Sequence, residues 1–152
     1  LNFQSKSVFN LCWSVAEYKG APMPNIPEKD WKTLRAMQDD LLQTACSRIL
    51  DKISKLIEES PDDKHTTYRK LWKTMRLEDG KIADMFNDVK RSNAKRKLAY
   101  WYGYGLIDDE TLQQFSEDTR QSVQSIFEIT FDGKKDNVGQ WTCPVKLNAN
   151  SL

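Results

Sequence analysis

The chain has 152 residues, 30% of them charged, and a formal net charge of +1. This length suits a single domain that buries its own apolar core. The nearly neutral total excludes a protein drawn to nucleic acid or to an acidic membrane by its overall charge. The single histidine, His65, excludes a metal site built from several histidines and disfavours most histidine-dependent catalysis.

Residues 5–19 predict a first helix, because their apolar side chains recur at steps of three and four and Gly20 follows at the position that commonly ends a helix. The next segment carries Pro22, Pro24 and Pro27, which exclude a helix interior. We therefore expect an extended linker between the first helix and the second.

Residues 28–59 form the stretch around which the rest of the chain is organised. They contain no Gly or Pro, and their apolar residues cover almost half of a helical wheel. A strict heptad repeat fails, because it places Arg48, Lys52 and Lys55 at seam positions. We therefore predict one long helix packed by several neighbours, in a shared dimer core or in a monomer.

The apolar pattern predicts two shorter helices after the long one. Asp62 or Asp63 is placed to cap a helix that Gly80 ends and that lies back antiparallel on the long one. Its apolar stripe comprises Tyr68, Leu71, Trp72 and Met75. Residues 81–102 predict a fourth helix, with a kink near Ser92 and Asn93 as one way to accommodate its scattered apolar residues.

Residues 106–127 predict a fifth helix, with Asp108 as its N-cap. Beyond it the helical period is lost, and residues 129–131 resemble a strand that enters a turn, with Trp141 as the anchor of a returning strand. The sequence thus predicts an all-α domain at residues 6–131, a bundle of about five helices around one long central helix. A short irregular or β-hairpin tail is expected at residues 132–152.

Charge is distributed unevenly along the chain. Residues 64–104 hold eleven Lys or Arg against four acids, whereas residues 105–128 hold six acids against Arg120. The densest part is 90–104, where five cations are followed by four aromatic residues. We predict that this stretch binds a partner through Lys90, Arg91, Lys95, Arg96, Lys97, Tyr100, Trp101, Tyr102 and Tyr104.

Three interpretations of this stretch remain open. Exposed Tyr and Trp are common anchors of protein interfaces, so a protein partner with an acidic or amphipathic segment is the first hypothesis, with Trp101 as its best candidate anchor. Cations beside aromatic rings also suit RNA or single-stranded DNA. Alternatively, the stretch packs inside the fold, with its cations paired to acids such as Asp109 and Asp118.

No set of residues in the sequence predicts catalysis, a metal site or a cofactor. Cys12, Cys46 and Cys143 are widely spaced and odd in number, which is typical of free thiols in a reducing compartment. No apolar run has the length of a membrane span, and the N-terminus lacks a signal-peptide pattern. We therefore expect a non-enzymatic adaptor or assembly domain in the cytoplasm or nucleus, with homodimerisation also open.

Overall fold

The computed structural model describes residues 24–59 and 63–135, and every regular element in those ranges is an α-helix. The elements are α2 (Glu28–Glu58), α3 (Lys64–Phe86), α4 (Ala94–Gly103), α5 (Asp109–Leu112) and α6 (Glu117–Phe131). The all-α prediction and the long helix from residue 28 are confirmed. The predicted first helix at 5–19 and the returning strand around Trp141 lie outside the described residues.

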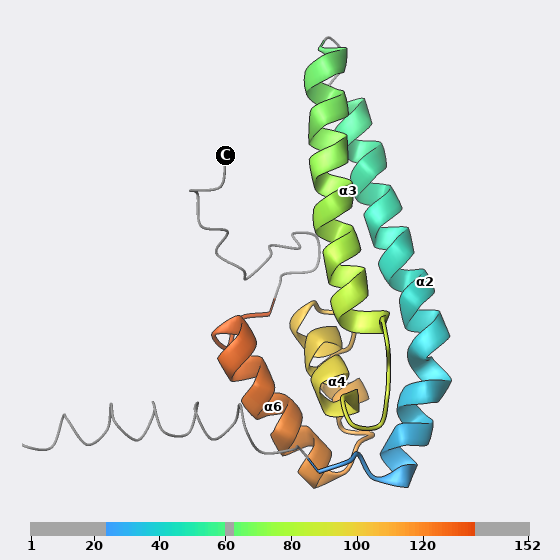
Figure 1. The fold of residues 1–152 in the computed structure, drawn as a ribbon, viewed down its shortest axis with the longest axis vertical. Coiled ribbons are helices and arrows are strands. Elements are labelled where there is room, and N and C mark those ends of the chain that lie inside the picture. The colour runs from blue at the N-terminus through green and yellow to red at the C-terminus, as the bar shows by residue number, and fades with distance from the viewer. Residues whose placement is uncertain (1–23, 60–62, 136–152) are drawn as a thin grey trace, which may run out of the picture.

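The helices α2 and α3 form an antiparallel hairpin, and the other helices gather at one end of it (Figure 1). α4 packs between α3 and α6 and also touches α2, so four helices share a core at this end, which we call the base. The opposite ends of α2 and α3 project beyond α4 and α6 (Figure 1). In this projecting part, among the helices of residues 24–59 and 63–135, each of the two has only the other as a neighbour.

Trp101 lies at the centre of the base with no exposed area. Its indole N–H donates to the Met85 carbonyl oxygen at 3.2 Å, and its ring centroid lies 5.6 Å from that of Phe86. α4 and α6 also approach closely at Gly103, where an added Cβ would overlap the ring of Phe131. Trp101 and Gly103 therefore allow α4 to pack closely against both α3 and α6.

The predicted end of the third helix at Gly80 is wrong, because α3 continues through this residue to Phe86. A glycine inside a helix costs about 1 kcal/mol, which burial of the following turn offsets. The chain leaves the helix at residues 87–93 instead. There Asp88 adopts a φ of 54°, and the Asn93 side chain accepts from the Lys90 N–H and donates to the Asp88 carbonyl oxygen.

The predicted fifth helix is divided into α5 and α6. Asp108 caps α5 as predicted, since its carboxylate accepts from the Thr111 N–H at 2.8 Å. α6 begins after Ser116 and extends to Phe131, so the strand predicted at 129–131 is wrong and these residues form the last helical turn.

A carboxylate from α2 supplies the cap of α6. Asp30 is fully buried and accepts from the Ser116 N–H at 3.1 Å, from the Ser116 hydroxyl at 2.5 Å and from the Thr119 hydroxyl at 2.5 Å. Burial raises the pKa of Asp30, but these hydrogen bonds outweigh burial and leave the pKa below its ordinary value. The start of the long helix is thereby fixed to the start of α6.

Candidate functional site

Most of the predicted partner-binding stretch, residues 90–104, is buried in the base. Trp101 is 0% exposed and Tyr104 is 3% exposed, so the expectation that Trp101 lies on the surface is wrong. The rings of this stretch instead stack on α6, where Tyr102 meets Phe127 edge to face with centroids 5.0 Å apart. Of the nine residues predicted to bind a partner, five are buried: Lys95, Lys97, Trp101, Tyr102 and Tyr104.

The buried cations of α4 bind internal partners. Lys95 pairs with Asp118 at 2.6 Å, which confirms the alternative that this basic stretch pairs with acids of the following helix. The Lys97 ammonium donates to the Asp84 carbonyl oxygen at 2.6 Å. Burial and the nearby Arg96 lower the pKa of Lys97.

The exposed remainder of this stretch does not form a continuous surface of cations and rings. Lys90 pairs with Asp88 at 2.9 Å, and Arg91 lies over the Trp31 ring. Arg96 is exposed, and Tyr100 is half-buried. Whether these residues touch a partner stays a prediction.

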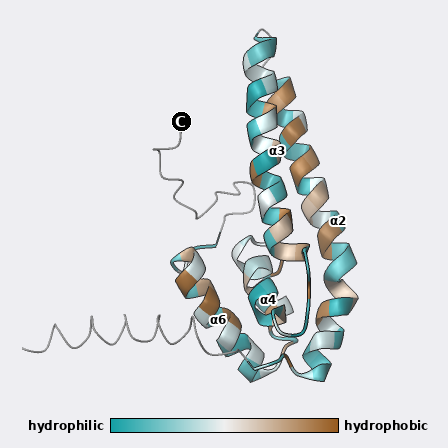
Figure 2. Cartoon of the chain, in the orientation of Figure 1, coloured by the Kyte–Doolittle hydropathy of each residue, from teal (hydrophilic) through white to brown (hydrophobic). Residues whose placement is uncertain are grey.

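A different surface carries the large apolar side chains that the fold leaves in water. Among the described residues, five of the large apolar residues that are exposed lie on the projecting part of the hairpin, and one of them, Trp72, is 59% exposed. Figure 2 shows apolar residues continuing along α2 beyond the level of α4 and α6. We call this surface the hairpin face; it comprises Leu50 and Ile57 of α2 and Tyr68, Trp72 and Met75 of α3.

The two helices present these side chains on the same side of the hairpin. Each exposed residue directly follows a less exposed residue that faces the partner helix, as Leu50 follows Ile49 and Trp72 follows Leu71. Each exposed residue is therefore rotated by about 100° around its helix from the seam between the two helices, in the same sense on α2 and on α3. Two antiparallel helices are related by a local two-fold axis perpendicular to the plane that contains them. Equal rotations on both helices therefore bring the two stripes to the same side of the hairpin.

The α3 edge of the hairpin face is basic. Residues 64–77 contain five Lys or Arg and no acid. At helical spacing, Arg69, Lys73 and Arg76 fall beside the exposed stripe on its outer side, and none of the three forms an ion pair with a residue in the described ranges. The α2 edge, at the equivalent positions, is of mixed charge and carries the exposed side chains of Asp51, Lys55 and Glu58. The face thus has an apolar centre, one basic edge and one edge of mixed charge.

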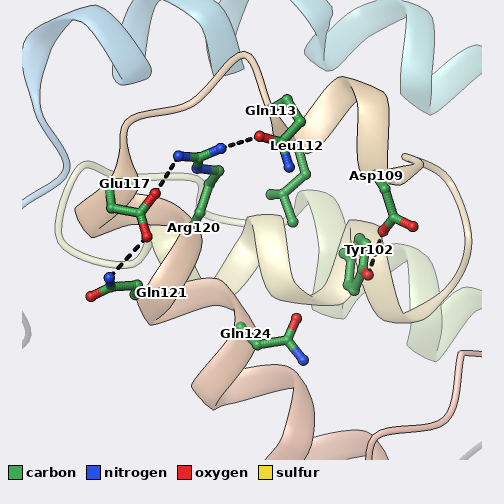
Figure 3. A pocket seen from close by; sticks show the side chains of 8 residues that line it. All are labelled: Tyr102, Asp109, Leu112, Gln113, Glu117, Arg120, Gln121 and Gln124. Atoms are coloured by element: carbon green, nitrogen blue, oxygen red, sulfur yellow. Dashed lines mark hydrogen bonds and ion pairs between the residues drawn. The ribbon is translucent and has the colours of Figure 1, made fainter.

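A polar pocket of about 390 Å³ lies on the base, between α4, α5 and α6 (Figure 3). Its charges are satisfied within the pocket, because Arg120 binds both Glu117 and Gln113 and the Tyr102 hydroxyl donates to Asp109 at 2.6 Å. Eight residues line it: Tyr102, Asp109, Leu112, Gln113, Glu117, Arg120, Gln121 and Gln124.

The titratable pair in this pocket is unsuited to proton transfer near neutral pH. Hydrogen bonds from Tyr102 and Lys135 lower the pKa of Asp109, so this carboxyl stays ionised. Burial and the hydrogen bond to Asp109 raise the pKa of Tyr102, so this phenol stays protonated. A general acid or base works best when its pKa lies near the operating pH, which neither group approaches.

Within residues 24–59 and 63–135, no three side chains of His, Cys, Asp or Glu gather in a way that could hold a metal ion. None of the helices in those ranges is long and apolar enough to cross a membrane. His65 is exposed in the first turn of α3. Comparison of the chain with protein-family models, with curated proteins and with solved structures gave no match.

The sequence does not predict the hairpin face, because the helical spacing of Tyr68, Trp72 and Met75 assigns them to the apolar stripe that packs inward. Two signals in the sequence distinguish them. A second helical stripe, Thr67 and Leu71, lies one residue earlier and supplies the inward face. No acid stands between residue 64 and residue 77, so Arg69 and Lys73 have none within four residues along the sequence.

Proposed function

We propose that this chain is a non-enzymatic helical module that binds another protein through the hairpin face. The observation that carries the proposal is the exposure of two aromatic residues, Tyr68 and Trp72, together with the other apolar side chains of the hairpin face, on the part of the fold that projects from the core. Contiguous exposed apolar surface marks interaction sites, and Trp and Tyr supply much of the energy at protein interfaces.

The proposal keeps the function class predicted from the sequence and moves its location. A partner of the base can reach Lys90, Arg91 and Arg96, but it cannot reach the Trp101 ring without unfolding α4. The hairpin face needs no such rearrangement, because its side chains already face water. As part of the same proposal, the module works inside the cell, in the cytoplasm or nucleus, as the odd and widely spaced cysteines favour.

A comparative pull-down tests this proposal. Trp72→Ala should remove bound proteins that the unchanged chain retains, with a loss of at least about 2 kcal/mol in affinity, the size typical of an interface hot spot. Leu77→Ala is the matched control, because Leu77 is exposed on the opposite side of the same helix. Ile129→Ala is a second control on α6. Equal retention by Trp72→Ala and by the controls would contradict the proposal.

Binding of RNA or single-stranded DNA is the second candidate function. The unpaired cations beside Tyr68 and Trp72 favour it, since such binders combine phosphate contacts with stacking on rings. The aliphatic residues Leu50, Ile57 and Met75 favour a protein instead, because aliphatic side chains neither stack on bases nor bind phosphate. A gel shift with mixed RNA and DNA at low salt would show nucleic-acid binding directly, and such binding should weaken steeply as salt is added.

A further inference from the structure

We infer that the occupant of the hairpin face is an amphipathic helix from another protein, with acidic residues along the edge that meets α3. This inference rests on the proposed function and adds the chemistry of the partner. It is argued from the spacing of the apolar stripes and from the charges on the two edges of the face.

The apolar stripes have the spacing that receives a third helix. Leu50 and Ile57 are seven residues apart on α2, and Tyr68 and Met75 are seven residues apart on α3. Each stripe therefore spans two helical turns, about 10 Å. Two parallel rows with this period form a shallow trough, which an added helix fills with side chains at positions i, i+3 or i+4, and i+7.

Charge determines how such a helix lies in the trough. Arg69, Lys73 and Arg76 follow one another at steps of four and three residues, so they form a line of cations along the α3 edge. A helix with Glu or Asp on that side pairs with this line, whereas its other side meets the mixed charges of Asp51, Lys55 and Glu58. Exposed ion pairs at a rim add up to about 1 kcal/mol each and act mainly on the rate of association and on salt dependence.

Other occupants fit less well. A second copy of the hairpin brings another line of cations, and on its α2 edge the acids Asp51 and Glu58 alternate with Lys55. Residues 5–19 of the same chain are apolar enough to bind, but they carry two lysines and the single acid Glu17. Neither supplies the acidic edge that the α3 side of the face calls for.

Selection from a display library tests the inference. The library consists of peptides of about 18 residues, with leucine at helical i, i+3 or i+4, and i+7 positions and with Glu, Lys or Gln varied elsewhere. Selection on the full chain should enrich peptides with Glu on one side of the leucine stripe. Binding of these peptides should fall at least tenfold in Trp72→Ala and in Tyr68→Ala, both substitutions of exposed side chains that leave the core intact.

Charge reversal tests the orientation of the bound helix. Arg69→Glu combined with Arg76→Glu should weaken the enriched acidic peptides at least tenfold and should favour peptides with Lys in place of Glu. Lys29→Glu combined with Lys32→Glu is the matched control, since these exposed lysines lie at the base end of α2. The control should retain the affinity of the unchanged chain within twofold.

Each failure has its own meaning. Enrichment of neutral or basic peptides that still require Trp72 overturns the acidic partner and leaves the proposed function standing. Peptides that bind Trp72→Ala as tightly as they bind the unchanged chain overturn both the inference and the proposed function.

A dimer in light scattering that Trp72→Ala dissociates identifies a second copy as the occupant and overturns the inference. A tenfold gain in peptide affinity on deletion of residues 1–23 identifies the chain's own N-terminal segment, and displacement of the peptides by RNA identifies nucleic acid; both also overturn it.

Discussion

α4 and the first half of α3 are built from the same kinds of residue, basic side chains interspersed with Trp and Tyr. In α4 the indole of Trp101 is enclosed by α3 and α6, and Lys95 reaches an aspartate of α6. In α3 the indole of Trp72 faces water, and Lys73 has no ion-pair partner among the described residues. The difference comes from the number of neighbouring helices in the described part of the chain, where α4 is surrounded at the base whereas this half of α3 has only α2 beside it.

The comparison shows that a basic and aromatic segment is not by itself an interaction site. Such a segment is buried when a helix with acidic and aromatic residues packs against it, as α6 packs against α4. Its side chains stay exposed when no such helix packs against it. Substitutions at matched positions in the two segments are therefore the clearest way to break the comparison.

The largest difference is expected at the two tryptophans. Trp101→Ala should lower the free energy of unfolding by about 3 to 5 kcal/mol, because it opens a cavity in the core. Trp72→Ala should change it by less than about 0.5 kcal/mol, as is usual for an exposed side chain. Urea denaturation followed by circular dichroism measures both. Similar losses in the two variants would mean that Trp72 is also part of a core.

The next largest effect is expected at Asp30, which fixes α2 to α6. Asp30→Ala should cost about 3 kcal/mol at neutral pH, because it leaves buried donors at Ser116 and Thr119 without an acceptor. Hydrogen bonding holds the pKa of Asp30 below 3.8 despite burial, so the carboxylate stabilises the fold above this pH. The difference from Asp30→Ala should therefore shrink as the pH falls below about 4.

Denaturation curves of both proteins between pH 7 and pH 3 check this expectation, on the acid side where protonation of Asp30 removes the stabilisation. The corresponding cap on the projecting part is Asp63, which accepts from the Thr66 N–H at 3.0 Å and is exposed. Asp63→Ala should cost only about 1 kcal/mol, the usual loss of an exposed N-cap. A larger loss at Asp63 than at Asp30 would reverse the ranking of the two regions.

A smaller effect is expected at Gly103, where α4 and α6 approach closely. Gly103→Ala should cost about 2 kcal/mol, because the new methyl group forces the Phe131 ring to move within a packed core. Gly80→Ala is the matched control in α3, where an added Cβ meets open space, and it should stabilise the chain by up to about 1 kcal/mol. Thermal unfolding of both variants separates the two outcomes, and a stabilising Gly103→Ala would show that the helices do not meet there.

The sequence predicts the elements whose signals are local. The 31-residue helix α2 lacks Gly and Pro in its interior, and the N-caps Asp63 and Asp108 stand directly before the helices that they cap. The break between α5 and α6 has a distant cause, because the carboxylate that binds Ser116 belongs to Asp30. No window along the chain contains both residues, so this break could not be read from local pattern.

The exposure of the two tryptophans follows only in part from local pattern. Helical spacing places Trp72 in the apolar stripe of its helix, and Trp101 is predicted on the surface, yet the structure exposes the first and buries the second. What separates them is the position of α4 and α6, which pack at the base and, among the described helices, do not extend over the far end of the hairpin (Figure 1). That arrangement is set by contacts between segments far apart in the chain, such as Trp101 with Met85 and Lys95 with Asp118.

Hydroxyl-radical footprinting of the free chain, read residue by residue by mass spectrometry, tests the central claim most directly. The account predicts fast oxidation of Trp72 and Tyr68 and strong protection of Trp101 and Tyr102, in line with their exposure. Protection of Trp72 equal to that of Trp101 would contradict it, because the hairpin face would then already be covered in the free protein.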